Sequence, residues 1–182
     1  MQHETNIQHE LVNKARDGDQ SARAELYRLF SRAMYNKCIR MAGNPTDAED
    51  LLHDAFVYAF EHLHQLKDPA AFGGWLGRIV VGECVRFSKK SLKWKDLDDD
   101  LSEDQPEENE WWNSIGIEQV NEEIKKLPDG CRQVFVLFAL ENYPHKLIAQ
   151  NLGISESTSK SQYQRARKLL KERLTNKTLN HG

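Results

Sequence analysis

The sequence lacks any apolar run long enough to cross a membrane, and hydrophobic residues make up 39% of its 182 positions. A membrane-spanning helix needs about 20 consecutive apolar residues. The first ten residues, MQHETNIQHE, also lack the basic and apolar segments of a secretory signal peptide. We therefore expect a cytoplasmic protein that is not inserted in a membrane.

Cysteine is scarce and follows no pattern. Cys38, Cys84 and Cys131 are far apart, odd in number and without the close pairing of zinc ligands or a disulfide framework. Free cysteine behaves as a small apolar residue, and disulfides are rare in reducing compartments. We expect all three thiols to be free and buried.

Groups that would mark an active site are missing as well. The sequence has no nucleophile–base pair, no phosphate-binding glycine loop and no paired catalytic carboxylates at a suitable spacing. His62 and His64 are two residues apart, so they do not face one another on a helix, and no cysteine joins them. We predict a protein that is not an enzyme and has no catalytic residues, no metal and no cofactor.

Acidic residues are concentrated in one segment. Residues 96–110 carry nine aspartates and glutamates and no lysine or arginine. Because the whole chain has a net charge of −3 and this segment carries −9, the remainder has a net charge of +6. The acidic overall composition therefore does not exclude a nucleic-acid-binding protein.

Apolar residues recur at helical spacing along most of the chain, which predicts an all-α protein of two small helical domains. A first helix ends at Asp17-Gly18, and further helices are expected at 21–41, 44–63, 75–95, 117–127, 131–140, 144–151 and 156–174. The acidic segment cannot bury enough apolar surface to offset its ordering entropy, so we expect a flexible linker there. The predicted boundaries are 1–95 for the first domain, 96–114 for the linker, 115–176 for the second domain and 177–182 for a tail.

The segment at 44–63, NPTDAEDLLHDAFVYAFEHL, combines two different helix faces. It opens with Asn-Pro, which suits an N-cap and the first helical position. At about 100° per residue, Asp47, Asp50, Asp54 and Glu61 form one stripe, and the apolar residues lie mostly opposite. Such a stripe is either a solvated face or a surface for a basic partner, and the segment alone does not separate the two.

The segment at 75–95, WLGRIVVGECVRFSKKSLKWK, is apolar at its start and basic at its end. Its β-branched run, Ile79-Val80-Val81, is compatible with a short strand as well as with a buried helix. The helical neighbourhood favours a helix. Trp75 at its beginning fits a core position as well as an exposed one.

Residues 144–173 have the pattern of a helix-turn-helix, in which the second helix enters the major groove of DNA. Gly153 stands in the turn where a left-handed residue is needed, and Ser155 is suited to cap the second helix. The inner face of the first helix is predicted to be Leu147, Ile148 and Ala149. Residues 157–173 contain six basic residues and one acidic residue, and this excess of positive charge favours DNA binding over a plain helical hairpin.

With these features together, the chain resembles the small, two-domain extracytoplasmic-function type of bacterial RNA polymerase sigma factor. DAEDLLHDAFVYAF resembles the family's polymerase-binding segment, and FGGWLGRIVVGECVRFSKK resembles its promoter-melting segment. LPDGCRQVFVLFALENYPHKLIAQNLGISESTSKSQYQRARKLL resembles its fourth conserved region. The resemblance covers nearly all of residues 7–174 and implies a factor that binds core polymerase, recognises two promoter elements and assists melting.

The resemblance also implies partners and contact residues. The expected partners are core RNA polymerase, through the clamp of its largest subunit and through the flap for the second domain, promoter DNA, and an anti-sigma factor. Clamp contacts are implied for Asp47, Glu49, Asp50, Leu51, Leu52, Asp54, Ala55 and Phe56. Contacts with the minus-ten element are implied for Lys67, Phe72, Trp75, Arg78, Arg86, Lys89 and Lys90, with residues 67–72 as the loop that receives a flipped base. Contacts with the minus-thirty-five element are implied for Thr158, Lys160, Ser161, Gln164, Arg165 and Lys168.

Four positions depart from the family's usual residues. His53 replaces glutamine, Gly82 replaces asparagine, Leu147 replaces glutamate and Ser157 replaces glycine. The first change keeps a polar residue at the docking surface. Gly82 weakens local helix propensity, and the last two changes bear on the fit of the second domain on DNA.

Two other classes of protein fit part of the sequence. A free-standing helix-turn-helix regulator accounts for residues 144–173 but leaves residues 44–90 unexplained. A helical protein-interaction module, such as an anti-sigma factor or a sigma-mimicking adaptor, leaves the basic residues of 160–173 without a role.

Overall fold

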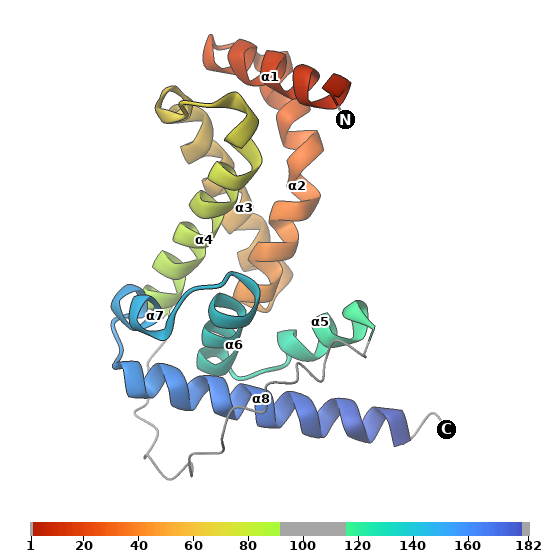
Figure 1. Cartoon of the computed structure of the whole chain (residues 1–182), viewed down its shortest axis with the longest axis vertical. Helices are drawn as coiled ribbons and strands as arrows, with labels where there is room; N and C mark the ends of the chain where they lie inside the picture. Colours follow the sequence, from red (N-terminus) through yellow and green to blue (C-terminus); the bar gives the residue numbers. More distant parts are fainter. Residues whose placement is uncertain (1, 92–115, 180–182) are drawn as a thin grey trace. The chain divides into compact units, whose positions relative to one another are not determined.

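The computed structural model describes residues 2–91 and 116–179, and every regular element in these ranges is a helix (Figure 1). The chain divides into two compact units, Met1–Val85 and Arg86–Gly182. The predicted linker at 96–114 lies outside the described residues. In the described part of the chain, no helix is both long and apolar enough to cross a bilayer.

The first unit is built from three helices and the start of a fourth. They are α1 (Gln2–Arg16), α2 (Gln20–Ala42), α3 (Pro45–Glu61) and α4 (Phe72–Ser91), with the short 3-10 turns η1 (Leu63–Gln65) and η2 (Pro69–Ala71) between α3 and α4. The helix α2 packs against both α1 and α3, and α1 also contacts η2. The segment 72–91 is helical throughout, as predicted, so the Ile-Val-Val run is not a strand.

The ends of these helices follow from local residue chemistry. Gly18 and Gly43 have left-handed φ values of 94° and 79°, which glycine adopts without strain, and they separate α2 from its neighbours. Asp19 caps α2 by accepting a hydrogen bond from the backbone N of Ala22 at 3.0 Å. Asn44 caps α3 with Pro45 in the first turn, which confirms the predicted start of that helix.

The core of the first unit is apolar and includes aromatic contacts. Among its fully buried side chains are Leu26, Met41, Leu63, Phe72 and Leu76. All three cysteines of the protein are free and buried, as predicted.

The second unit holds the remaining helices. They are α5 (Ile117–Lys125), α6 (Asp129–Phe135) with its π-helical continuation η4 (Val136–Leu140), α7 (His145–Leu152) and α8 (Glu156–Leu179). The long helix α8 packs against α5, α6 and α7. Ile148, Leu152, Leu170 and Leu174 are among the buried residues that these contacts bring together. The helix-turn-helix is therefore held on a support of two further helices.

Candidate protein and nucleic-acid interfaces

Four acidic side chains of α3 are exposed or half-exposed to solvent. We call Asp47, Glu49, Asp50 and Asp54 the carboxylate surface. Asp47 is half-buried and the other three are exposed. The Asn44 amide donates a hydrogen bond to the Asp47 carboxylate at 2.7 Å, and its side-chain oxygen accepts one from the Asp47 backbone N at 3.0 Å. Within residues 2–91 and 116–179, none of the four carboxylates forms an ion pair, so their charge is available to a basic partner.

The apolar residues predicted to contact the polymerase clamp lie on the opposite side of α3. Leu51, Leu52, Ala55 and Phe56 are only 0–6% exposed. Phe56 packs against Tyr27 of α2 with ring centroids 4.7 Å apart. The structure therefore corrects their role from partner contacts to core residues, which fix α3 so that the carboxylate surface faces outward.

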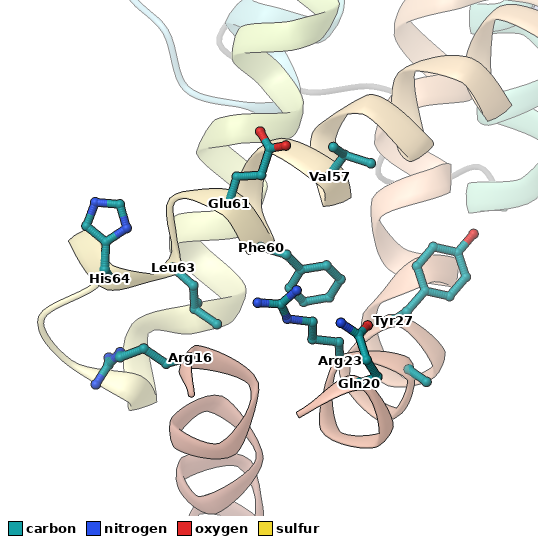
Figure 2. Close-up of a pocket in the computed structure, with 10 residues that line it drawn as sticks. Arg16, Gln20, Arg23, Tyr27, Val57, Phe60, Glu61, Leu63 and His64 are labelled. Atoms are coloured by element: carbon teal, nitrogen blue, oxygen red, sulfur yellow. The ribbon is translucent and has the colours of Figure 1, made fainter. Parts of the chain in front are cut away.

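A hollow of about 620 Å³ lies beside α3 in the first unit (Figure 2). Arg16, Arg23, Tyr27, Val57 and Phe60 are among its lining residues. The Nη2 atom of Arg16 donates to the Leu66 carbonyl at 2.8 Å, and Nε of Arg23 donates to the Ala15 carbonyl at 3.1 Å. Arg16 is thus anchored to the backbone after η1, and Arg23 is anchored to the backbone near the end of α1.

Exposed apolar residues near the carboxylate surface were not identified from the sequence. Val57 and Tyr58 on α3 are 43% and 38% exposed, and Tyr27 on α2 is 42% exposed. The helical spacing of the sequence could have identified Val57 and Tyr58 as exposed. They lie between the buried residues 55–56 and buried Ala59, and so on the part of the helix that turns away from the core. These side chains add apolar area beside the carboxylate surface.

The outer face of α4 is basic. Trp75, Arg78, Gly82, Arg86 and Lys89 recur three or four residues apart, which places them on one side of the helix. Trp75 is half-buried, and Arg78, Arg86 and Lys89 are exposed, as is the neighbouring Lys90. A Cβ atom built on Gly82 would meet nothing within 4 Å. Packing therefore does not require glycine, which costs the helix about 1 kcal/mol relative to alanine.

The loop before α4 is only partly available to a ligand. Lys67 is exposed, whereas Phe72 is completely buried and its ring meets Phe30 edge-on at a centroid distance of 5.1 Å. Phe72 was predicted to contact DNA, and the structure corrects this, because its ring is in the core. The exposed part of the loop is short, with Asp68 capping η2 through the backbone N of Ala70 at 2.9 Å.

The helix-turn-helix has the predicted turn. Gly153 has a φ of 72°, and its backbone N and that of Ile154 donate to the Ala149 carbonyl at 2.9 and 3.1 Å. Ser155 caps α8 by accepting from the backbone N of Thr158 at 2.9 Å. Ile148 and Ala149 are buried as predicted, but Leu147 is 38% exposed. Its assignment to the inner face is therefore wrong, and it is an apolar residue on the surface of α7.

The face of α8 away from its core carries the residues predicted to read the minus-thirty-five element. Lys160, Arg165 and Lys168 are exposed, and Thr158, Ser161 and Gln164 are half-buried. The buried side of the same helix includes Ser159, Gln162, Ala166 and Leu170. Gln162 is fixed there, because its side-chain oxygen accepts a hydrogen bond from the Cys131 thiol at 3.0 Å. The polar and basic residues thus share one accessible side.

A histidine links α7 to the beginning of α8. Nδ1 of His145 is 2.9 Å from the hydroxyl of buried Ser159, and its ring stacks on Phe138 at 4.2 Å between centroids. Burial lowers the pKa of His145 below its usual 6.5, and the positive charge of Lys160 lowers it further, while Glu156 acts in the opposite direction. The neutral imidazole is therefore the form that suits the folded domain.

We expect the second unit to lose stability as the pH falls through about 6.5, because the unfolded chain then binds the His145 proton more tightly than the folded one. Amide hydrogen-exchange protection factors of α7 and α8 in the full-length protein, which correct for the pH dependence of the intrinsic exchange rate, should be lower at pH 5.5 than at pH 7.5. His145→Gln should remove most of that difference, and His53→Gln, at an exposed position in the first unit, should leave it in place. An equal pH response in both variants would contradict the assignment to His145.

His62 and His64 lie just beyond the end of α3, His62 at its C-cap and His64 in η1. Their rings are stacked with centroids 6.2 Å apart, and Nδ1 of His62 lies 2.8 Å from the Tyr58 carbonyl. Over the described ranges, no group of three His, Cys, Asp or Glu residues is placed to hold a metal ion.

Comparison with known families and proteins gives matches along both units. The family model "Sigma-70 region 2" matches residues 26–94, and "Sigma-70, region 4" matches residues 117–170. The ECF RNA polymerase sigma factor SigW of Bacillus subtilis is 27% identical over 181 residues, covering 90% of this chain and 94% of SigW. The ECF RNA polymerase sigma factor SigM of the same organism is 28% identical over 150 residues, covering 81% of this chain and 91% of SigM.

Among solved structures, that of CnrH in complex with the cytosolic domain of CnrY aligns with a TM-score of 0.49 and 26% identity, over 93% of this chain and 98% of CnrH. The two matched sigma-70 regions together span more than half of the chain. They occur in the order that the three sequence motifs predicted. The chain therefore belongs to the sigma-70 family of RNA polymerase sigma factors, and within it to the extracytoplasmic-function (ECF) type.

Proposed function

We propose that this protein is a transcription initiation factor that binds core RNA polymerase, directs it to specific promoters and assists promoter melting. It catalyses no reaction itself, and the chemistry of RNA synthesis belongs to the polymerase. An anti-sigma factor is a further partner that the family resemblance implies.

The observation that carries this proposal is that one chain has two surfaces of opposite charge, one acidic and one basic. The carboxylate surface on α3 is exposed and without ion pairs in the described structure. The helix-turn-helix presents Lys160, Arg165 and Lys168 on the accessible side of α8. The carboxylate surface is therefore suited to bind a basic protein, and the basic side of α8 is suited to bind nucleic acid.

We infer that the polymerase contacts are Asp47, Glu49, Asp50 and Asp54, supported from beneath by the buried side of α3. Exposed carboxylates contribute mainly to the rate and specificity of association, and apolar contacts supply more of the affinity. Val57, Tyr58 and Tyr27 lie close enough in the fold to supply such contacts. Loss of the acids should therefore slow association and make binding less sensitive to salt.

Promoter recognition is divided between α4 and α8. The basic side of α4 is suited to a single strand, because cations follow the phosphates and Trp75 offers a ring face to an unstacked base. The outer side of α8 is suited to duplex DNA, with phosphate contacts from lysine and base contacts from Arg165 and Gln164.

A free-standing DNA-binding regulator would need only the second unit. Such a protein leaves the sigma-70 region 2 match over residues 26–94 and the carboxylate surface unexplained. The two functions differ in whether DNA binding depends on polymerase, because a single helix-turn-helix with few phosphate contacts binds weakly at physiological salt.

Fluorescence anisotropy with one labelled promoter duplex separates them. We expect the full-length protein alone to bind the duplex poorly and with little sequence preference. Addition of core RNA polymerase should give tight binding that discriminates against a scrambled promoter. Tight, sequence-specific binding by the protein alone, unchanged by polymerase, would favour the regulator instead.

A further inference from the structure

The first turn of α8 contains an ion pair between Lys160, a predicted DNA contact, and Glu156, which was not predicted to contact DNA. Nζ of Lys160 lies 3.0 Å from Oε1 of Glu156, one helical turn earlier. The two side chains are 60% and 49% exposed, so both charged groups can be reached from solvent. In a helix-turn-helix, the residues at the beginning of the second helix are the ones that contact base edges.

The two groups have opposite hydrogen-bonding capacities. An ionised glutamate can only accept hydrogen bonds, and a lysine ammonium can only donate them. In the major groove, guanine offers the acceptors O6 and N7, and cytosine offers the N4 amino group as a donor. A single G·C pair therefore places an acceptor beside a donor, which complements an ammonium beside a carboxylate.

We infer that Glu156 and Lys160 act together as a reader of one G·C base pair in a fixed orientation. Lys160 donates to O6 and N7 of the guanine, and Glu156 accepts from N4 of the cytosine. Glu156 is thus a further specificity-determining residue. This inference rests on the proposed function, because it requires α8 to be the reader of a promoter element.

The ion pair gives the reader its orientation. If the base pair is inverted to C·G, the cytosine amino group faces the ammonium and the guanine acceptors face the carboxylate. Both contacts then bring like partners together, donor against donor and acceptor against acceptor. Exclusion of the inverted pair is therefore as important to specificity as the attraction for the correct one.

The experiment uses the full-length protein with core RNA polymerase and a promoter library in which each base pair of the minus-thirty-five region is changed singly. Occupancy of each promoter is compared among wild type, Glu156→Ala, Lys160→Ala and the control Glu172→Ala. Glu172 is also an exposed acid on α8, about 24 Å further along the helix at 1.5 Å per residue. Its removal changes the net charge by the same amount as removal of Glu156.

For wild type we expect one position at which G·C is preferred over C·G about tenfold, as for a specific base contact. Glu156→Ala and Lys160→Ala should each reduce that preference to about twofold at the same position and leave other positions unchanged. Glu172→Ala should retain it.

Two results would overturn the inference while leaving the proposed function intact. In the first, Glu156→Ala gives the same library profile as Glu172→Ala, which would mean that Glu156 acts only through net charge. In the second, Glu156→Ala and Lys160→Ala change preference at different base pairs. A wild-type protein that gives polymerase no promoter preference would contradict the proposed function itself.

Discussion

Replacing Asp50 and Asp54 by lysine is expected to abolish association with core RNA polymerase. Both residues are exposed on α3 and form no ion pair in the described structure, so the double change should cost the fold little. It converts two attractive charges into two repulsive ones against a basic partner, which typically costs several kcal/mol at an interface, or about a hundredfold or more in affinity. Pull-down of purified core polymerase at several salt concentrations measures the effect.

A matched control has the same change in charge at another place. Glu10 and Asp17 are exposed on or next to α1, and Glu10 forms a surface ion pair with Lys14. Glu10→Lys with Asp17→Lys should bind polymerase almost as wild type does. If both double variants retained binding, the carboxylate surface would be only a solvated face of the helix.

Combined replacement of Lys67 and Trp75 by alanine is expected to reduce promoter opening while leaving closed-complex formation almost intact. Lys67 is exposed in the loop and Trp75 is half-buried at the start of α4, so both can meet an unpaired strand. Loss of one stacked base costs about 1–3 kcal/mol, which corresponds to a five- to 150-fold decrease in the population of open complex. Permanganate reactivity of unpaired thymines measures opening, and a gel-shift assay measures binding.

The control keeps the aromatic face. Lys67→Ala with Trp75→Phe should open the promoter better than the double alanine variant, and a promoter with a pre-melted bubble should restore part of the lost activity. Phe72→Ala is unsuited to this purpose, because removal of a fully buried phenylalanine costs about 3–5 kcal/mol of stability. Equal opening by all variants would mean that the loop is only a connection between helices.

Much of the fold was predictable because the helix boundaries depend on local chemistry. The Asn-Pro start of α3, the glycine at 153 and the serine cap of α8 each have a hydrogen bond or backbone angle that only a few residue types supply. Periodicity also separated the acids of α3 from its buried side. These features are encoded within a few residues and need no knowledge of the tertiary packing.

The errors concern residues whose exposure depends on distant parts of the chain. Phe72 follows an exposed loop, but Phe30 of α2 covers its ring. Leu147 has the spacing of an inner residue, yet the first turn of α7 leaves it 38% exposed. The hollow beside α3 combines Arg16 and Arg23 with residues about 40 positions later. Sequence spacing along one helix does not reveal such neighbours.

Run-off transcription with purified core RNA polymerase on a library of promoter fragments tests the central claim most directly. We expect polymerase alone to give no specific transcript, and polymerase with this protein to give transcripts from a small subset of fragments that share two spaced sequence elements. The Asp50→Lys, Asp54→Lys variant should give none. If the wild-type protein left the transcripts unchanged, or only repressed them by binding DNA without polymerase, the protein would not be an initiation factor.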